Sequence, residues 1–304
     1  MKWFILLFFI SLEAFSQEKN YDSLQVSIDP EVQGTLLSPK GGNQPPLAIL
    51  IAGSGPTDRD GNQAQLKNNS LKYLAEGLAQ KGIATFRYDK RVIAQINKAT
   101  VQEEKMTFED EVNDALLVVN HFKDKYKKII LIGHYEGSLI GLLVAQKVVV
   151  SKFVSISGAG NSSATLIEEQ IGKNAPQLKE ESQKIISQLR KGELVDNISP
   201  YLAPVFRKSV QPYLISWFKY EPAKEIAKLQ IPILIVQGTN DLQVEDKEVQ
   251  LLKEAQPKAQ LLLIEGMNHV LKKVKTLEEN QQSYLNPDLP IPGELVEGIA
   301  SFIK

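Results

Sequence analysis

Cysteine is absent from this 304-residue chain, so the chain can form no disulfide and offers no thiol for a lipid anchor. Charge of one sign is also lacking: the formal net charge is −1, which gives no reason to expect nucleic acid or an anionic membrane as a partner. Beyond the first residues, no run approaches the roughly 20 apolar residues that a membrane-spanning helix needs. We therefore expect no stable membrane insertion.

The N-terminus has a composition of its own. A basic Lys2 precedes the short apolar run Trp3–Ile10, and Ala14-x-Ser16 follows. This order is typical of a cleavable signal peptide over residues 1–16, with cleavage before Gln17. A buried first helix is the alternative, but the polar residues after position 16 do not continue one. The pattern predicts a periplasmic or secreted protein.

Residues 17–304 alternate between two kinds of segment. Apolar runs of strand length are separated by stretches of helix length whose apolar residues recur every three or four positions. This alternation predicts one α/β domain with a doubly wound, mostly parallel sheet, and the 43% hydrophobic content is enough for its core. The expected strands are Leu47–Ala52, Ile83–Tyr88, Lys128–Gly133, Phe153–Gly158, Ile231–Gly238 and Gln260–Gly266, with an antiparallel edge hairpin of Gln25–Ile28 and Gly34–Leu37. The expected helices are Ser70–Lys81, Phe108–Lys123, Ser138–Val148, Glu245–Glu254 and Pro292–Ile303.

One region, at about 161–228, lacks the strand pattern and contains helical segments instead. We expect it to form a helical cap over the carboxyl edge of the sheet, where ligands bind in open α/β folds. Its helical segments are Ala164–Ile171, Gln177–Arg190 and Val205–Trp217. Its aromatic residues either line a pocket or pack the cap; they are Tyr201, Phe206, Tyr213, Trp217 and Phe218.

A turn between a strand and a helix carries the first chemical signal. The sequence Gly133-His134-Tyr135-Glu136-Gly137 follows an apolar strand and precedes a helical segment. Strand, G-x-x-x-G turn and helix form the context of a nucleophile elbow, in which the central residue is strained and the glycines allow close packing. The central residue here is Tyr135 rather than serine.

Two further loops complete the pattern. Asp241 follows the strand 231–238, and His269 follows the strand 260–266. The chain has only three histidines, so a histidine at this place is informative. An elbow, then an acid, then a histidine is the chain order of an α/β-hydrolase triad. These positions predict His269 as the base and Asp241 as the group that orients it.

The glycine-rich loop 53–62 follows the first buried strand. Backbone N–H groups of such a loop can point toward a developing oxyanion, together with the N–H of Glu136 after the elbow. An ordinary turn is the alternative interpretation, and no Gly-Lys-Ser/Thr ending follows that would indicate a phosphate site.

At these four segments the chain resembles the α/β-hydrolase superfamily, and more closely the exported bacterial esterases of the EstD group. The resemblance covers nearly the whole of 17–304. It implies hydrolysis of carboxylic esters without metal or cofactor, with Tyr135, Asp241 and His269 at the catalytic positions and Ser54 and Glu136 at the oxyanion positions. The expected partner is a small-molecule ester or another pocket ligand.

Two departures from the family pattern concern function. Tyr135 replaces the serine, and Val92 and Ala94 replace the two glycines that the family commonly has after Tyr-Asp-x-Arg. A tyrosine hydroxyl lies roughly 4 Å beyond the position of a serine hydroxyl, so attack from it misaligns the oxyanion donors. Two hypotheses remain open. One is an esterase that uses Tyr135 as nucleophile, and the other is an inactive homologue that binds a small molecule or a partner in the capped pocket.

Overall fold

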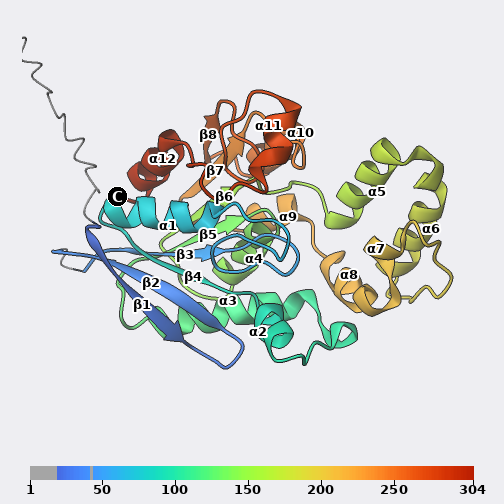
Figure 1. Cartoon of the computed structure of the whole chain (residues 1–304), viewed down its shortest axis with the longest axis horizontal. Coiled ribbons are helices and arrows are strands. Elements are labelled where there is room, and N and C mark those ends of the chain that lie inside the picture. The colour runs from blue at the N-terminus through green and yellow to red at the C-terminus, as the bar shows by residue number, and fades with distance from the viewer. Residues whose placement is uncertain (1–18, 42–43) are drawn as a thin grey trace, which may run out of the picture.

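A computed structural model describes residues 19–41 and 44–304. Its centre is an eight-stranded sheet in the order β1-β2-β4-β3-β5-β6-β7-β8, in which β1 and β2 pair antiparallel and all pairs from β4–β3 onward are parallel (Figure 1). The strands are β1 Tyr21–Ser27, β2 Gln33–Pro39, β3 Leu47–Ile51, β4 Ala84–Tyr88, β5 Ile129–His134, β6 Lys152–Ile156, β7 Ile233–Gly238 and β8 Gln260–Ile264. The predicted doubly wound, mostly parallel α/β fold is confirmed, and the antiparallel hairpin makes the sheet mixed.

Helices cover both faces of the sheet, which explains why the central strands read as continuous apolar runs. All five residues of β3 are buried, and those of odd and even number enter two separate cores. One core contains α1 Ser70–Gln80 and α12 Gly293–Ile303. The other contains α3 Phe108–Phe122, α4 Glu136–Ala145, α9 Pro222–Ile226 and α10 Asp246–Ala255.

Helix α3 begins with a capping box. The Thr107 hydroxyl accepts from the backbone at the third helical position, and the Asp110 carboxylate accepts from the Thr107 N–H at 2.8 Å. Such reciprocal bonds satisfy amide groups that a helix start would otherwise leave unpaired. The cap fixes the first turn of α3, where Glu111 lies.

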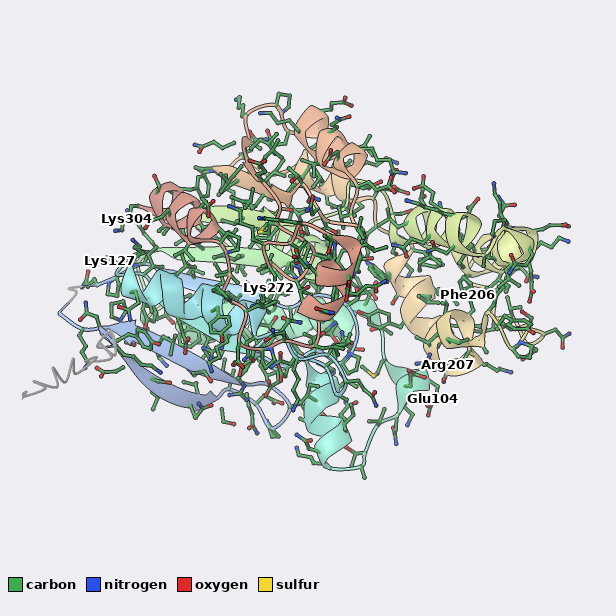
Figure 2. The ribbon with its side chains drawn as sticks, turned by 45° about the horizontal axis from the view of Figure 1, so that its top comes forward. Glu104, Lys127, Phe206, Arg207, Lys272 and Lys304 are labelled. Carbon is green, nitrogen blue, oxygen red and sulfur yellow. The ribbon has the colours of Figure 1, made fainter. Side chains whose placement is uncertain are left out.

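Between β6 and β7, helices form a lobe beside the sheet, seen at the right of Figure 1. We call this segment the helical lobe; it comprises α5 Ser163–Asn174, α6 Lys179–Arg190, α7 Ala203–Phe206 and α8 Gln211–Trp217, and leads into α9. It has a small hydrophobic core of its own that includes Phe206, which Figure 2 labels inside the lobe.

The helix expected over Val205–Trp217 is wrong as one element. The backbone becomes extended at Arg207 (φ −49°, ψ 146°), and a 3-10 turn, Lys208–Val210, separates α7 from α8. Pro212 lies in the first turn of α8, where a missing N–H costs nothing, and it disfavours helix continuation from before. Another helix that the sequence analysis did not separate, α2 Arg91–Asn97, begins directly after β4.

The expected signal peptide at 1–16 lies outside the described residues. Within 19–41 and 44–304, no helix is long and apolar enough to cross a membrane. The remaining helix of the body, α11 Leu277–Ser283, follows the His269 loop.

Candidate active site

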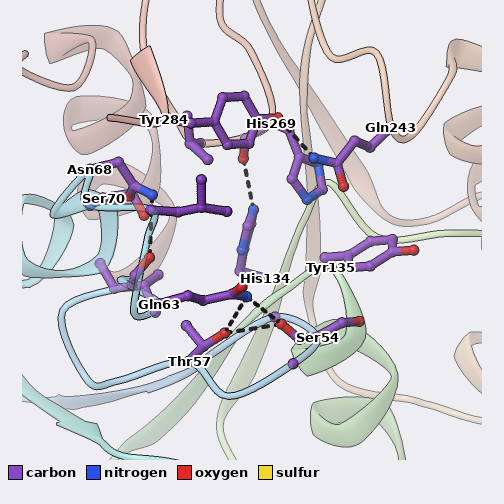
Figure 3. Close-up of a pocket in the computed structure, with 16 residues that line it drawn as sticks. Ser54, Thr57, Gln63, Asn68, Ser70, His134, Tyr135, Gln243, His269 and Tyr284 are labelled. Atoms are coloured by element: carbon purple, nitrogen blue, oxygen red, sulfur yellow. Dashed lines mark hydrogen bonds between the residues drawn. The ribbon is translucent and has the colours of Figure 1, made fainter. Parts of the chain in front are cut away.

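Three loops meet at the carboxyl edge of the parallel strands. The loop after β5 carries Tyr135, the loop after β7 carries Asp241, and the loop after β8 carries His269. Figure 3 shows Tyr135 and His269 close together in one pocket. Parallel strands end at one edge, so residues that are far apart in sequence come together there.

Asp241 and His269 form a buried hydrogen-bonded pair. The Nδ1 atom of His269 lies 3.0 Å from Oδ2 and 3.1 Å from Oδ1 of Asp241, and the two residues are 5% and 7% exposed. The Asp241 carboxylate also accepts from the amides of Gln243 (2.9 Å) and Val244 (3.0 Å). Burial acts to raise the pKa of Asp241, but His269 and these amides hold it below its usual value. An ionised, fixed Asp241 orients the imidazole as a general base requires.

The turn at Tyr135 is strained and tightly packed. Tyr135 has φ 51° and ψ −112°, a conformation that costs a non-glycine residue on the order of 1–3 kcal/mol. A Cβ on Gly133 would lie 2.2 Å from the Gly137 carbonyl oxygen, and one on Gly137 would lie 2.3 Å from the Ile51 oxygen. Only glycine fits at both places, because the obstructing atoms are backbone.

Tyr135 contacts the base through its ring. The Tyr135 and His269 ring centroids are 5.1 Å apart with an interplanar angle of 80°, an edge-to-face arrangement. In Figure 3 the hydroxyl points away from His269 and from the Ser54–Thr57 loop, and it makes no hydrogen bond to any described residue. Burial, and then the charges of Glu136 and Asp241, raise the pKa of Tyr135 well above its usual value. The phenol therefore stays neutral at physiological pH.

His134 connects the turn at Tyr135 to the loop that carries His269 by a hydrogen bond. Its Nε2 atom lies 2.9 Å from the carbonyl oxygen of His269, as the dashed line in Figure 3 shows. Burial, and then the neighbouring His269, lower the pKa of His134 to about 3. His134 is therefore neutral and acts as a donor to that carbonyl.

Glu136 links three parts of the molecule. Its carboxylate is 1% exposed and accepts from Lys90 Nζ (2.6 Å), the Tyr213 hydroxyl of α8 (2.9 Å) and the Ser54 hydroxyl (3.0 Å). Lys90 also donates to the Gly53 carbonyl at 3.3 Å. The network fixes the Ser54 loop beside the elbow, while the amides of Ser54 and Glu136 bond to no other described residue. These two amides are thus available to an oxyanion.

No motif in the sequence indicates a role for Lys90 or Glu111. The one usable signal is that Lys90 follows β4 at the same sheet edge as the other loops. Lys90 is 5% exposed and its ammonium lies 3.9 Å from Oε1 of Glu111. Although burial opposes it, the Glu111 and Glu136 carboxylates raise the pKa of Lys90.

Besides a small cavity of about 20 Å³ that Tyr135 and Glu136 line, two larger pockets adjoin the elbow. The first, which we call the elbow pocket, has a volume of about 360 Å³ and includes Tyr135, His134 and His269. Its other polar lining is mostly amide and hydroxyl: Ser54, Thr57, Gln63, Asn68, Ser70, Gln243 and Tyr284 (Figure 3). Several of these groups bond to one another, as Gln63 does to Thr57 (3.0 Å) and Gln243 to Tyr284 (2.8 Å).

The second, which we call the lobe pocket, has a volume of about 240 Å³ and lies between the Ser54–Pro56 loop and the helical lobe. Its lining includes Lys90, Glu111 and Glu136, and the lobe contributes Tyr213 and Trp217. These two aromatic residues therefore line a pocket, whereas the other three candidates do not. Phe206 and Phe218 are buried in the core of the lobe, and Tyr201 is 79% exposed.

Ser138, a second hydroxyl near the elbow, is not placed to replace the missing serine. It is buried in the first turn of α4, and its Oγ lies 2.7 Å from Oγ of Ser155 beneath the turn. Among residues 19–41 and 44–304, no cluster of three or more His, Asp or Glu side chains could hold a metal ion.

Known proteins with a similar sequence or structure agree with the α/β arrangement described above. No family model matches the sequence. Esterase EstD of Thermotoga maritima is 26% identical over 246 residues, which cover 78% of this chain and 57% of EstD. The chain thus spans little more than half the length of this relative.

Solved structures with the same fold include Est1E from Butyrivibrio proteoclasticus, with a TM-score of 0.57, 20% identity and coverage of 92% of this chain and 96% of that one. A dienelactone hydrolase from Anabaena variabilis matches with a TM-score of 0.51, 14% identity and coverage of 93% and 97%. The chain has the α/β-hydrolase fold. The likeness to EstD confirms the expected resemblance, and the solved structures confirm the fold.

Proposed function

We propose that this protein binds a small molecule between the sheet edge and the helical lobe and forms no acyl-enzyme. The observation that most supports this proposal is the position of Tyr135. Its ring packs edge-to-face on His269, and its hydroxyl has no hydrogen bond to that histidine. Nucleophilic catalysis requires the nucleophile within hydrogen-bond reach of its base, about 2.6–3.2 Å.

The electrostatics support the same conclusion. Burial raises the pKa of Tyr135, so deprotonation by an imidazole is less favourable than for an ordinary phenol. Removal of a triad nucleophile costs on the order of 10⁶ in kcat, with roughly 10³ over the uncatalysed rate remaining. The pockets beside the elbow, by contrast, remain open to a ligand.

A second function is favoured by one observation, the intact Asp241–His269 pair. In this mechanism His269 activates a water molecule that attacks a bound carboxylic ester directly, and the Ser54 and Glu136 amides stabilise the oxyanion. The tetrahedral oxyanion then collapses, the bond to the alcohol oxygen breaks, and His269 returns the proton taken from water to the leaving alcohol. No covalent bond to the protein forms, and Tyr135 only shapes the pocket. The name of EstD as an esterase supports an ester as the bound compound.

The test is hydrolysis of p-nitrophenyl acetate and butyrate by the full chain, beside Tyr135→Phe, Tyr135→Ser and His269→Ala. The binding function predicts that wild type and Tyr135→Phe are equally inactive, while Tyr135→Ser hydrolyses both esters. Tyr135→Ser also serves as the control for an intact fold.

Two other outcomes contradict the proposal. Turnover by the wild type that Tyr135→Phe abolishes establishes an acyl-tyrosine, with Tyr135, Asp241 and His269 as the catalytic set. Turnover that Tyr135→Phe leaves intact and His269→Ala abolishes establishes the water mechanism.

A further inference from the structure

The lobe pocket contains a carboxyl group with unused hydrogen-bonding capacity. Glu111 is 4% exposed, lines the pocket, and makes no hydrogen bond to any residue in the described part of the chain. Its nearest cation, Lys90 Nζ, lies 3.9 Å from Oε1, beyond hydrogen-bond distance. Glu111 therefore has a distant ion-pair partner but no hydrogen-bond donor, which leaves its carboxylate with acceptor capacity in the pocket that it lines.

Glu136, in the same pocket, is by contrast a carboxylate with several hydrogen-bond donors around it. It accepts three hydrogen bonds, from Lys90, Tyr213 and Ser54. The Lys90 ammonium and the Tyr213 hydroxyl are thereby committed to Glu136. Glu111 is left as the acceptor that a ligand can reach.

The rest of the pocket favours an apolar body. Val92, Met106, Leu214 and Trp217 contribute apolar lining around the charged groups. A volume of about 240 Å³ is suited to a single ring with a short substituent, since a cavity of roughly 150 Å³ holds benzene. The Trp217 side chain adds an aromatic surface that also attracts cations.

We propose that the lobe pocket binds a small amphipathic compound with a one-ring apolar body and a hydrogen-bond-donating head, an amine or an alcohol, which donates to Glu111. This assignment rests on the proposed function and names the ligand class of one of its two pockets. An anionic head is disfavoured, because three carboxylates line this pocket and both of its cations are already paired, Lys90 with Glu136 and Arg207 with Glu103.

The test uses Trp217 as the reporter. The chain has two tryptophans, Trp3 and Trp217, so in the full chain carrying Trp3→Phe the fluorescence comes from Trp217 alone, which lines the lobe pocket. We would titrate it with benzylamine, benzyl alcohol and phenylacetate at pH 8 and follow the fluorescence. The expected result is saturable binding of the amine and the alcohol, with phenylacetate at least about tenfold weaker.

Glu111→Gln removes the negative charge of the side chain that accepts from the ligand's head group and keeps the shape of that side chain. The substitution should weaken benzylamine about tenfold, since hydrogen bonds to charged groups are roughly twice as strong as neutral ones, and should change benzyl alcohol by less than about threefold. Glu254→Gln, at an exposed glutamate of α10, is the matched control and should change neither.

The proposal is overturned if phenylacetate binds as tightly as benzylamine, if no ligand gives a saturable signal, or if Glu111→Gln leaves all three affinities unchanged. The ligand comparison in the chain with native Glu111 decides the question even if Glu111→Gln does not fold. Ester hydrolysis is measured by product release and lobe-pocket binding by Trp217 fluorescence, so the two can fail separately.

Discussion

The two sides of the elbow differ in how closely their side chains match the arrangement of a hydrolase active site. On one side, Asp241 and His269 are buried and hydrogen-bonded, as a catalytic acid–base pair requires. On the other side, the turn keeps its glycines and its strained backbone, but Tyr135 presents a ring where a reactive oxygen is needed. The difference teaches that the backbone of a strained turn and the side chains around it are fixed by packing independently of which side chain stands at the centre of the turn.

Restoring the nucleophile should have the largest effect. In Tyr135→Ser the hydroxyl sits one bond from Cβ, within reach of His269 and the Ser54 and Glu136 amides, so hydrolysis of p-nitrophenyl acetate should rise on the order of 10⁴-fold. Steady-state kinetics measure this, with Tyr135→Ala as the control that opens the same space without a nucleophile. Equal gains in both variants would show that the pocket, and not the hydroxyl, limits the rate.

Removing the base should be the next largest effect. Added to Tyr135→Ser, His269→Ala should lower kcat/KM on the order of 10³-fold, because serine then has no group to accept its proton. The same kinetics apply, and circular dichroism verifies the fold. If the double variant keeps the activity of Tyr135→Ser, the retained Asp241–His269 pair is not a working acid–base pair.

Glu111 should make stability depend on pH. Burial, countered by Lys90 and reinforced by Glu136 and Asp114, raises the pKa of Glu111 to about 7, from its usual 4.5. The folded state therefore binds more protons than the unfolded state between these values, and this carboxyl lowers stability as pH rises through that window. Glu111→Gln should raise the free energy of unfolding by about 2–3 kcal/mol at pH 8 and by far less at pH 4.5.

Urea unfolding at the two pH values measures this difference. The positive charges near the carboxyl, on Lys90 and Arg91, remain in the variant and do not titrate in this range. An equal change at both pH values would mean that Glu111 ionises as an ordinary exposed carboxyl.

The smallest effect concerns the link between lobe and elbow. Tyr213→Phe removes one hydrogen bond to the Glu136 carboxylate and should lower the free energy of unfolding by about 1–2 kcal/mol. Tyr201→Phe, at an exposed position of the lobe, is the control and should change nothing measurable. Urea denaturation compares the two, and identical curves would show that the Tyr213 bond does not stabilise the fold.

The sequence predicted the fold because each signal was local. A strand such as β3, buried on both faces, reads as five consecutive apolar residues, and the loops after β5, β7 and β8 could then be assigned to one sheet edge. The same logic placed Asp241 and His269 in adjacent loops before any geometry was available. What it could not give was the direction of the Tyr135 ring, which packing against His269 determines.

The charged lining of the lobe pocket could not be predicted from the sequence, for a different reason. Lys90, Glu111, Glu136 and Tyr213 come from four separate elements, and no spacing or motif relates them. The sequence indicated a backbone role for Glu136 and a pocket or packing role for Tyr213, whereas Lys90 and Glu111 alone read as ordinary surface residues of a loop and a helix. Only the tertiary fold removes them from water and turns them into partners.

The strained turn at Tyr135 has a consequence for how this protein can change over time. Since backbone atoms of Ile51 and Gly137 enclose both glycines, no side chain can grow at those positions without unfolding the local structure. Position 135 is not enclosed by backbone in this way, since the Tyr135 side chain lines the elbow pocket. The turn can therefore carry a different side chain at its centre while both glycines and the backbone stay the same.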